Sequence, residues 1–161
     1  MGSGVSGSYG SINNSQSQPY STSYGVTSDM LQFDINRGVY DGKYDINPTA
    51  RNINESIIGD YIVSSDFSKV LTYVIDMNDN IIIANRNGNG YNGKATPHPT
   101  LIGGENPRVK MAGMLHIREG KIEKYDYNSG HFKPNIESMK VAEKVFGKLS
   151  SKLFVGGKKK W

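Results

Sequence analysis

Two short apolar runs on either side of a polar turn constrain this chain more than any other feature. The first run is Val70–Met77, the second is Ile81–Ala84, and the segment Asn78–Asn80 separates them. β-branched and aromatic residues favour extended backbone, and an Asn/Asp cluster favours a tight turn. The two runs are apolar almost throughout, so we expect a hairpin with both faces largely buried. Such a hairpin needs other parts of the chain packed on each of its faces.

A second hairpin is predicted further along the chain. Apolar and polar residues alternate through Arg108–Ile117, Glu119 and Gly120 form a turn signal, and Lys121–Tyr127 supplies the partner strand. Alternation with a period of two is typical of a strand with one buried face. The residues expected on that face are Val109, Met111, Leu115 and Ile117.

A helix is predicted over Asn135–Leu149, directly after Pro134. Its apolar positions fall on one stripe at helical spacing, as expected of a helix that covers a sheet. The stripe consists of Ile136, Met139, Ala142, Val145, Phe146 and Leu149. The fold class that follows is α+β: a small antiparallel sheet of two hairpins with a C-terminal helix packed on it.

The remaining segments give a provisional division of the chain. Residues 1–28 carry no charged side chain and are rich in Ser, Gly and Asn, so we expect a flexible leader. Residues 29–54 are predicted to wrap the core irregularly, with Leu31, Phe33 and Ile35 in a short strand. We expect a compact domain over 55–155 and a basic tail over 156–161.

The amino-acid composition excludes several classes of protein. The chain has no cysteine, which excludes disulfide scaffolds, Cys-ligated metal sites and thiol nucleophiles, and it has three histidines. No apolar run reaches the roughly 18 residues of a membrane span. Residues 29–107 hold six Lys/Arg against ten Asp/Glu, whereas residues 108–161 hold thirteen against five. The basic half is either a solvated lysine-rich surface or a surface for an anionic partner such as RNA, a phosphate-bearing cofactor or an acidic protein.

Two loops carry the residues best suited to chemistry. The segment 97–104 contains His98 and Thr100, and the segment 128–134 contains Ser129 and His131. Two histidines on neighbouring loops suit general acid–base catalysis, the chemistry that RNA strand cleavage requires. In that case Lys133, Lys110 or Arg108 would stabilise the negative charge on phosphorus. The alternative is that both histidines only hydrogen-bond to backbone in tight turns.

Several motifs together resemble a known family. They are Val74–Ile81, His98–Gly104, Met111–Met114, Glu119–Ile122 and Ser129–Pro134. The combination, over about residues 70–150, resembles a C-terminal toxin domain of bacterial polymorphic toxins (Rhs-type or similar delivered effectors). It is also similar to the C-terminal domain of plant IQ-motif calmodulin-binding proteins. The chain departs from that pattern at Pro99 and Thr100, where the family has two serines, and at Phe132, where it has tyrosine.

The resemblance implies a secreted effector that a larger delivery protein carries into the cytoplasm of a target cell. It implies a cognate immunity protein if the victim is a competing bacterium. Many toxins of this size are mono-ADP-ribosyltransferases, and the triplet beginning at His98 resembles the one with which some of them hold NAD. On this hypothesis NAD is the co-substrate, no metal takes part, and ADP-ribose is transferred to a protein or RNA of the translation machinery or another essential target.

The transferase hypothesis assigns roles to particular residues. The predicted catalytic residues are His98, Thr100, Ser129 and His131, and the predicted NAD-binding residues are His98, Thr100, Tyr73 and Arg108. An acidic residue among Glu105, Glu119 and Glu123 is an alternative for the transfer step. Two other functions stay open at this point: a metal-independent ribonuclease toxin with His98 and His131 as acid and base, and a non-enzymatic binding module.

Overall fold

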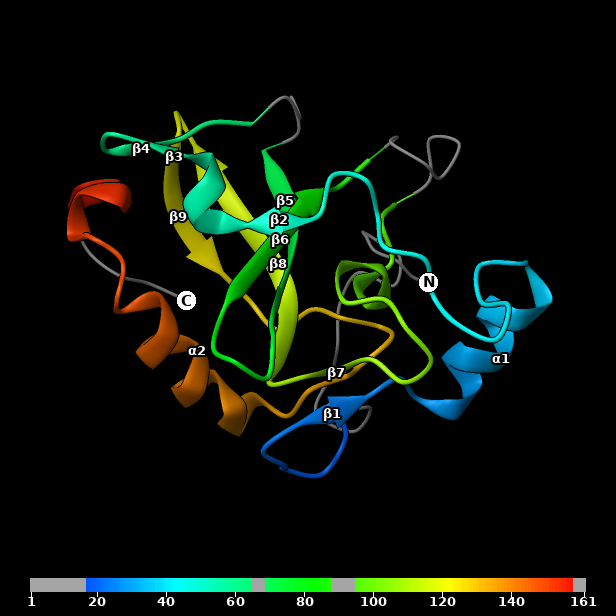
Figure 1. Ribbon diagram of the computed structural model, residues 1–161. Helices are drawn as coiled ribbons and strands as arrows, with labels where there is room; N and C mark the ends of the chain where they lie inside the picture. The colour runs from blue at the N-terminus through cyan, green and yellow to red at the C-terminus, as the bar shows by residue number, and fades with distance from the viewer. Residues whose placement is uncertain (1–16, 65–68, 88–94, 158–161) are drawn as a thin grey trace.

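A five-stranded antiparallel sheet forms the centre of the computed structural model, which describes residues 17–64, 69–87 and 95–157 (Figure 1). Its strands are, in spatial order, β2 (Arg51–Asn52), β6 (Ile81–Asn85), β5 (Val70–Ile75), β8 (Met111–Arg118) and β9 (Lys121–Tyr125). Every neighbouring pair is antiparallel. The α+β class and the antiparallel sheet are therefore confirmed.

Both predicted hairpins are present, and they lie side by side because β5 pairs with β8. Within the first hairpin Ile75 faces Ile81 across the turn, as the apolar runs predicted. Five of the six residues of β5 are buried, because protein covers both faces of the sheet at this strand. Strand β2 adds a fifth, outer strand beside β6.

The C-terminal helix covers one face of the sheet. Helix α2 (Met139–Phe146) is shorter than the predicted helix, because a 3₁₀ turn, η4 (Ile136–Ser138), precedes it. The Phe146 ring stacks on Tyr125, with 4.0 Å between the ring centroids, and meets the edge of Tyr73 at 5.4 Å. These rings belong to the larger of two buried apolar clusters, which holds α2 against the sheet.

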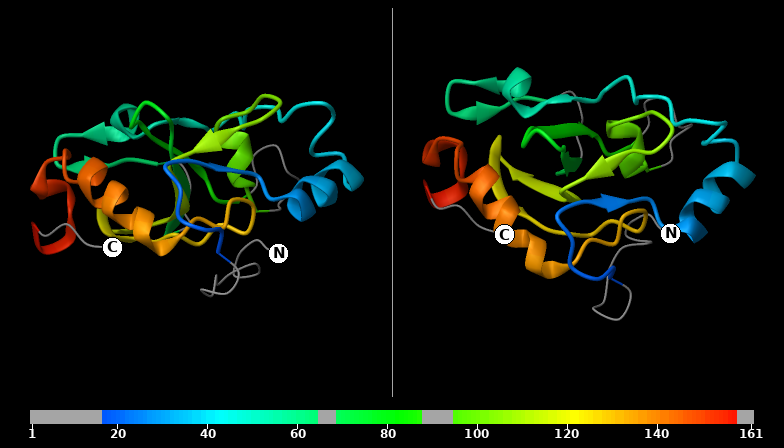
Figure 2. Two further views of the ribbon diagram at one scale, coloured as in Figure 1. Left: turned by 90° about the horizontal axis from the view of Figure 1, so that it is seen from below. Right: turned by 60° about the horizontal axis from the view of Figure 1, so that its bottom comes forward.

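The opposite face of the sheet carries a smaller cluster and most of the irregular chain (Figure 2). Two elements cover it: the 3₁₀ helix η3 (His98–Leu101) and a two-stranded ribbon of β1 (Tyr24–Gly25) and β7 (Arg108–Val109). Leu101, Val109 and Phe132 pack there against the alternate residues of the central strands. Val109 thus lies on the face opposite Met111, contrary to the prediction, because β7 pairs with β1 and not with β5.

The chain before residue 54 differs most from the prediction. Leu31, Phe33 and Ile35 lie in a helix, α1 (Ser28–Asn36), and not in a strand. Residues 17–28, expected to be part of a flexible leader, are packed on the domain: Tyr24 is buried and its hydroxyl lies 2.6 Å from Ser138 Oγ. The compact unit therefore includes much of what was assigned to the leader and to the wrapping segment. Helices α1 and α2 lie at opposite ends of the molecule (Figures 1 and 2).

Short elements complete the fold. They are a small hairpin of β3 (Ile57–Ile58) and β4 (Tyr61–Ile62), and the 3₁₀ turns η2 (Ile53–Ser56), η5 (Ser151–Leu153) and η6 (Val155–Gly157). The leader before residue 17, the glycine-rich loop over 88–94 and the end of the basic tail lie outside the described residues. Within the described ranges, no helix is both long enough and apolar enough to cross a membrane.

One glycine is required by close packing of backbone on backbone. A Cβ atom at Gly113, in the middle of β8, would lie 2.0 Å from the carbonyl oxygen of Asp126. The obstacle is main chain, so it cannot rotate away. We expect Gly113→Ala to lower the free energy of unfolding by about 3 kcal/mol, as overpacking does in other cores. Urea denaturation would measure it.

The matched control is Lys124→Ala, an exposed change on the adjacent strand β9. We expect it to alter stability by no more than about 0.5 kcal/mol. Equal stability of the Gly113 and Lys124 variants would contradict the close approach of β8 to Asp126.

Candidate functional site

The two histidine loops converge on the sheet face opposite α2. Helix η3 begins after Pro97, and Pro99 fixes its first turn, so His98 is directed toward the sheet by a rigid segment. The loop that follows β9 brings His131 to the same face, next to Phe132. Both histidine side chains are completely buried. The sequence predicted this meeting of the two loops but not the burial.

The hydrogen bond of His98 fixes which ring nitrogen carries the proton. Its Nε2 lies 2.8 Å from the carbonyl oxygen of Gly113. A carbonyl oxygen only accepts, so Nε2 donates and Nδ1 of the neutral ring keeps a lone pair. Nδ1 is buried and has no hydrogen-bond partner among the described residues. His98 therefore presents an unused acceptor inside the protein.

Burial also keeps His98 uncharged. Burial lowers the pKa of His98 to about 3, the hydrogen bond to Gly113 opposes this change, and the nearby positive charges of Arg86 and His131 reinforce it. The charges of Arg86 and His131 thus act on His98 within the protein interior. At neutral pH His98 is thus a neutral base.

His131 is held by a carboxylate that the sequence analysis did not select. Its Nε2 lies 2.9 Å from Asp34 Oδ2, and because a carboxylate accepts, Nε2 is again the donor. Burial lowers the pKa of His131 below its ordinary value, and the hydrogen bond and negative charge of Asp34 offset this only in part. The pair has the Asp–His arrangement that fixes a tautomer and stabilises an imidazolium ion.

Asp34 is bonded on both of its oxygens. Oδ2 also accepts from the Tyr44 hydroxyl at 2.6 Å, and Oδ1 accepts from Nε and Nη2 of Arg37 at 3.0 and 2.8 Å. Burial alone would raise the pKa of Asp34, but these donors together with His131 hold it below its ordinary value of 3.8. Burial and the adjacent Asp34 carboxylate raise the pKa of Tyr44 well above its usual range.

A buried arginine completes the cluster. Arg86 Nη1 lies 3.4 Å from Thr72 Oγ1 and 3.3 Å from the carbonyl oxygen of Thr96. The sequence could have indicated this position. Side chains alternate between the two faces of a strand, so residue 86 is expected on the same sheet face as Ile82 and Ala84. We name His98, His131, Asp34 and Arg86 the histidine cluster. No comparable pattern marked Asp34, which lies in a polar segment.

The predicted hydroxyl residues are buried beside the histidines but take part in turns. Thr100 Oγ1 donates to the carbonyl oxygen of Pro97 at 2.6 Å, within η3. Ser129 Oγ accepts from the backbone N–H of Phe132 at 3.2 Å. Both hydroxyls keep lone pairs for a further donor, but their first role is to shape the two histidine loops.

Other predicted site residues lie elsewhere. Tyr73 is in the core beneath α2, where its hydroxyl donates to the carbonyl oxygen of Asp126 at 2.6 Å. Arg108 is exposed and its guanidinium is bonded to Ser23. Glu119 and Glu123 are exposed at the β8–β9 hairpin, where Glu123 pairs with Arg118 at 3.4 Å. Glu105 is also exposed, and its carbonyl oxygen accepts from Tyr40.

Neither a metal-binding cluster nor a relative helps to identify the site. Among the described residues, no group of three or more His, Cys, Asp or Glu side chains is placed to hold a metal ion. No protein-family model, curated protein or solved structure matches the chain.

The burial of His98 makes stability depend on pH. Below pH 6.5 the unfolded chain takes up a proton at this residue that the folded protein does not, until the pH reaches about 3. The unfolded state is therefore favoured as the pH falls, by up to about 1.4 kcal/mol per pH unit. We expect His98→Gln, which keeps a donor for Gly113, to remove the contribution of His98 to the slope of the free energy of unfolding against pH.

Urea unfolding at pH 7, 6, 5 and 4 would compare the variant with the wild type. Equal slopes in the two proteins would contradict the neutral, buried state of His98.

A second prediction concerns the carboxylate. Asp34→Ala leaves buried donors without an acceptor, so we expect a loss of about 3–5 kcal/mol in the free energy of unfolding at pH 7. Asp29, an exposed residue of the same helix, provides the control: Asp29→Ala should cost less than about 1 kcal/mol. Thermal or urea denaturation of the two variants at equal concentration makes the comparison. A small effect at Asp34 would mean that the network does not hold α1.

Proposed function

We propose that the chain is a toxin domain that cleaves RNA by general acid–base catalysis, with the two histidines of the cluster as the catalytic residues. The observation that carries the proposal is the difference between their environments. His98 is held neutral with an unused lone pair on Nδ1, whereas His131 is bonded to the Asp34 carboxylate, which partly offsets the lowering of the His131 pKa by burial. Two titratable groups that differ in this way, one with a neutral and one with an anionic acceptor, suit the base and the acid of such a pair.

The roles follow from the hydrogen bonds. Nδ1 of His98 removes the proton of a ribose 2′-hydroxyl, and that oxygen attacks the adjacent phosphorus. His131, as an imidazolium ion paired with Asp34, gives a proton to the departing 5′-oxygen. The products are a 2′,3′-cyclic phosphate and a free 5′-hydroxyl, with one proton taken up and one released. Each transfer contributes about 10²–10⁴-fold to the rate.

Arg86 supplies positive charge at the same place. A buried guanidinium close to His98 attracts the phosphodiester and stabilises the additional negative charge on phosphorus in the transition state. A phosphate beside the two rings also raises their pKa values, which helps His131 to carry its proton. The cluster is therefore complementary to a phosphodiester as well as to a hydroxyl group.

Substrate reaches the buried histidines only if a covering segment moves. Helix α1 is the element best suited to this, because Asp34 is the single buried residue among its nine residues. Phe33 and Ile35 on the same helix are 48% and 44% exposed. The helix is thus held mainly by the polar bonds of Asp34, and a motion that admits substrate must keep the bond between Asp34 and His131, on which the proposed acid depends.

ADP-ribosyl transfer from NAD is the second candidate. One observation favours it: the unused Nδ1 of His98, with Thr100 in the same 3₁₀ helix, can accept a hydrogen bond from a ribose hydroxyl. The carboxylates considered for the transfer step fit less well, because Glu105, Glu119 and Glu123 are exposed, and Asp34 is already bonded on both oxygens. NAD binding and ADP-ribosyl transfer are therefore our second proposal, after the ribonuclease.

The delivery of the domain and its immunity partner rest on the family resemblance. Motifs such as Ser129–Pro134 suggest a toxin carried by a larger protein into the cytoplasm of its victim. If the victim is a competing bacterium, a cognate immunity protein belongs to the proposal. A non-enzymatic binding module would keep its toxicity after both histidines are replaced.

The test is RNA cleavage by the purified chain in the presence of EDTA. We expect cleavage to persist in EDTA, because proton transfer by histidines needs no metal ion, and to fall by about 10²–10⁴-fold in His98→Gln and in His131→Gln. His116→Gln is the matched control, because His116, a half-buried histidine on β8, is bonded to Asp126, which is not part of the cluster. Products ending in a 2′,3′-cyclic phosphate would identify the mechanism.

A parallel incubation with labelled NAD and a cell lysate separates the two candidates. Transfer of label to protein or RNA, lost in His98→Gln, would establish the transferase and overturn the nuclease. Absence of label together with cleaved RNA would establish the reverse.

A further inference from the structure

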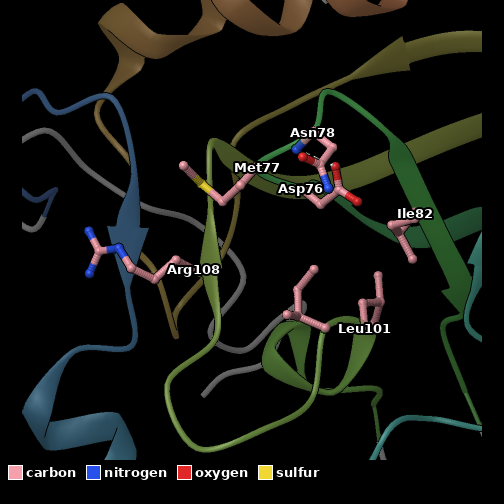
Figure 3. A pocket seen from close by; sticks show the side chains of 7 residues that line it. Asp76, Met77, Asn78, Ile82, Leu101 and Arg108 are labelled. Carbon is pink, nitrogen blue, oxygen red and sulfur yellow. Dashed lines mark hydrogen bonds between the residues drawn. The ribbon is translucent and has the colours of Figure 1, made fainter.

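A surface cavity of about 330 Å³ lies at the Leu101 end of η3, the 3₁₀ helix that begins with His98 (Figure 3). It is formed where the β5–β6 turn approaches η3 and the start of β7. The lining residues are Asp76, Met77, Asn78, Ile82, Leu101, Ile102 and Arg108. Its size is at the lower end of the range for small-ligand sites, about 300–1,000 Å³, and suits a single ring system.

The walls of this cavity are apolar on opposite sides. Ile82 from β6 and Leu101 from η3 form one side, and Met77 from the β5–β6 turn lies on the other, with its sulfur directed away from them in Figure 3. Met77 is 45% exposed, so its thioether is available to a ligand. Arg108 contributes its aliphatic stem, because its guanidinium is directed away to Ser23. A flat aromatic ring between a thioether and aliphatic side chains suits such walls.

A carboxylate fixed in position forms the polar rim. Asp76 Oδ1 accepts from the backbone N–H groups of Asn78 and Asn80 at 2.9 and 2.8 Å, and Oδ2 accepts from Asn80 Nδ2 at 3.1 Å. A carboxylate has about four acceptor sites, so one is left for a ligand donor. The turn therefore holds Asp76 ready to accept a hydrogen bond from an amino group.

The separation between His98 and the cavity residue Leu101 is about the size of one nucleotide. His98 and Leu101 are the first and last residues of η3, and a 3₁₀ helix rises about 2.0 Å per residue, so the two lie about 6 Å apart along the helix axis. A ribose at His98 would place its base within reach of the cavity.

We propose that this cavity binds a nucleobase and prefers bases that carry an exocyclic amino group. The inference rests on the proposed function only in taking the ligand to be a nucleotide, which both RNA and NAD supply. Cytosine and adenine present an amino donor to the Asp76 carboxylate, as in known base–carboxylate pairs. Uracil presents a carbonyl oxygen at the corresponding position, which the carboxylate repels.

Binding of nucleoside monophosphates that the protein does not cleave tests this directly. In NMR titrations of the intact chain with CMP and UMP, we expect CMP to bind about tenfold more tightly and to shift the amide signals of the β5–β6 turn and η3. Asp76→Asn retains the acceptor for the turn amides and replaces the other oxygen, which accepts from Asn80 Nδ2, with a donor. It should reduce the CMP/UMP ratio to about one or reverse it.

Two further variants guard against a change in the fold. Met77→Ala should weaken both ligands about threefold without changing their ratio, because it removes only the stacking surface. Ile136→Ala, a change at a residue 38% exposed near the start of α2, should leave both affinities unchanged. Equal affinities for CMP and UMP in the wild type, or an unchanged ratio in Asp76→Asn, would overturn the proposal.

The source of the base is read from two additional ligands. Tighter binding of NAD than of AMP would assign the cavity to a dinucleotide. Tighter binding of an uncleavable 2′-deoxycytidyl dinucleotide than of CMP would assign it to an RNA strand. Either result supports a base site. RNA cleavage without any of these shifts would overturn the base site and leave the nuclease standing, so the two proposals fail separately.

Discussion

The burial of one carboxylate organises the half of the molecule that carries the histidines. Asp34 accepts hydrogen bonds from Arg37 and Tyr44, which are close to it in the sequence, and from His131, which is 97 residues away. Removing such a group from water is costly unless its oxygens are bonded, and the network meets that condition. Helix α1 has no other buried residue, so its place on the domain depends on these bonds.

The hydrogen-bond acceptors of the two histidines, one from the backbone and one from a side chain, fix which ring nitrogen carries the proton. A carbonyl acceptor at His98 and a carboxylate acceptor at His131 each fix Nε2 as the donor. The first acceptor is neutral and the second is charged, so Asp34 partly offsets the effect of burial on the pKa of His131, whereas at His98 the opposing effect is the hydrogen bond to the Gly113 carbonyl. The carbonyl belongs to Gly113, whose missing side chain allows Asp126 to approach β8.

The spacing of apolar residues predicted those parts of the fold in which it clearly follows the period of a strand or of a helix. The β5–β6 hairpin, the β8–β9 hairpin and α2 have strong apolar patterns, and all three are present. Helix α1 was missed because alternation at Leu31, Phe33 and Ile35 suggested a strand, whereas these residues are not fully buried in the structure. The two histidine loops could be selected from their residues, but Asp34 could not, since its role comes from contacts across 97 positions of sequence.

The described N-terminal segment is fixed to the domain by residues more than 100 positions further along the chain. Gln18 bonds to the backbone of Lys133, and Tyr24 bonds to Ser138, a separation of 114 residues. Contacts at such separations form slowly, because the loop between them must be closed first. The same holds for the bond between Asp34 and His131, which spans 97 residues. The histidine cluster therefore cannot form on a nascent chain until residue 131 has been synthesised and has left the ribosome.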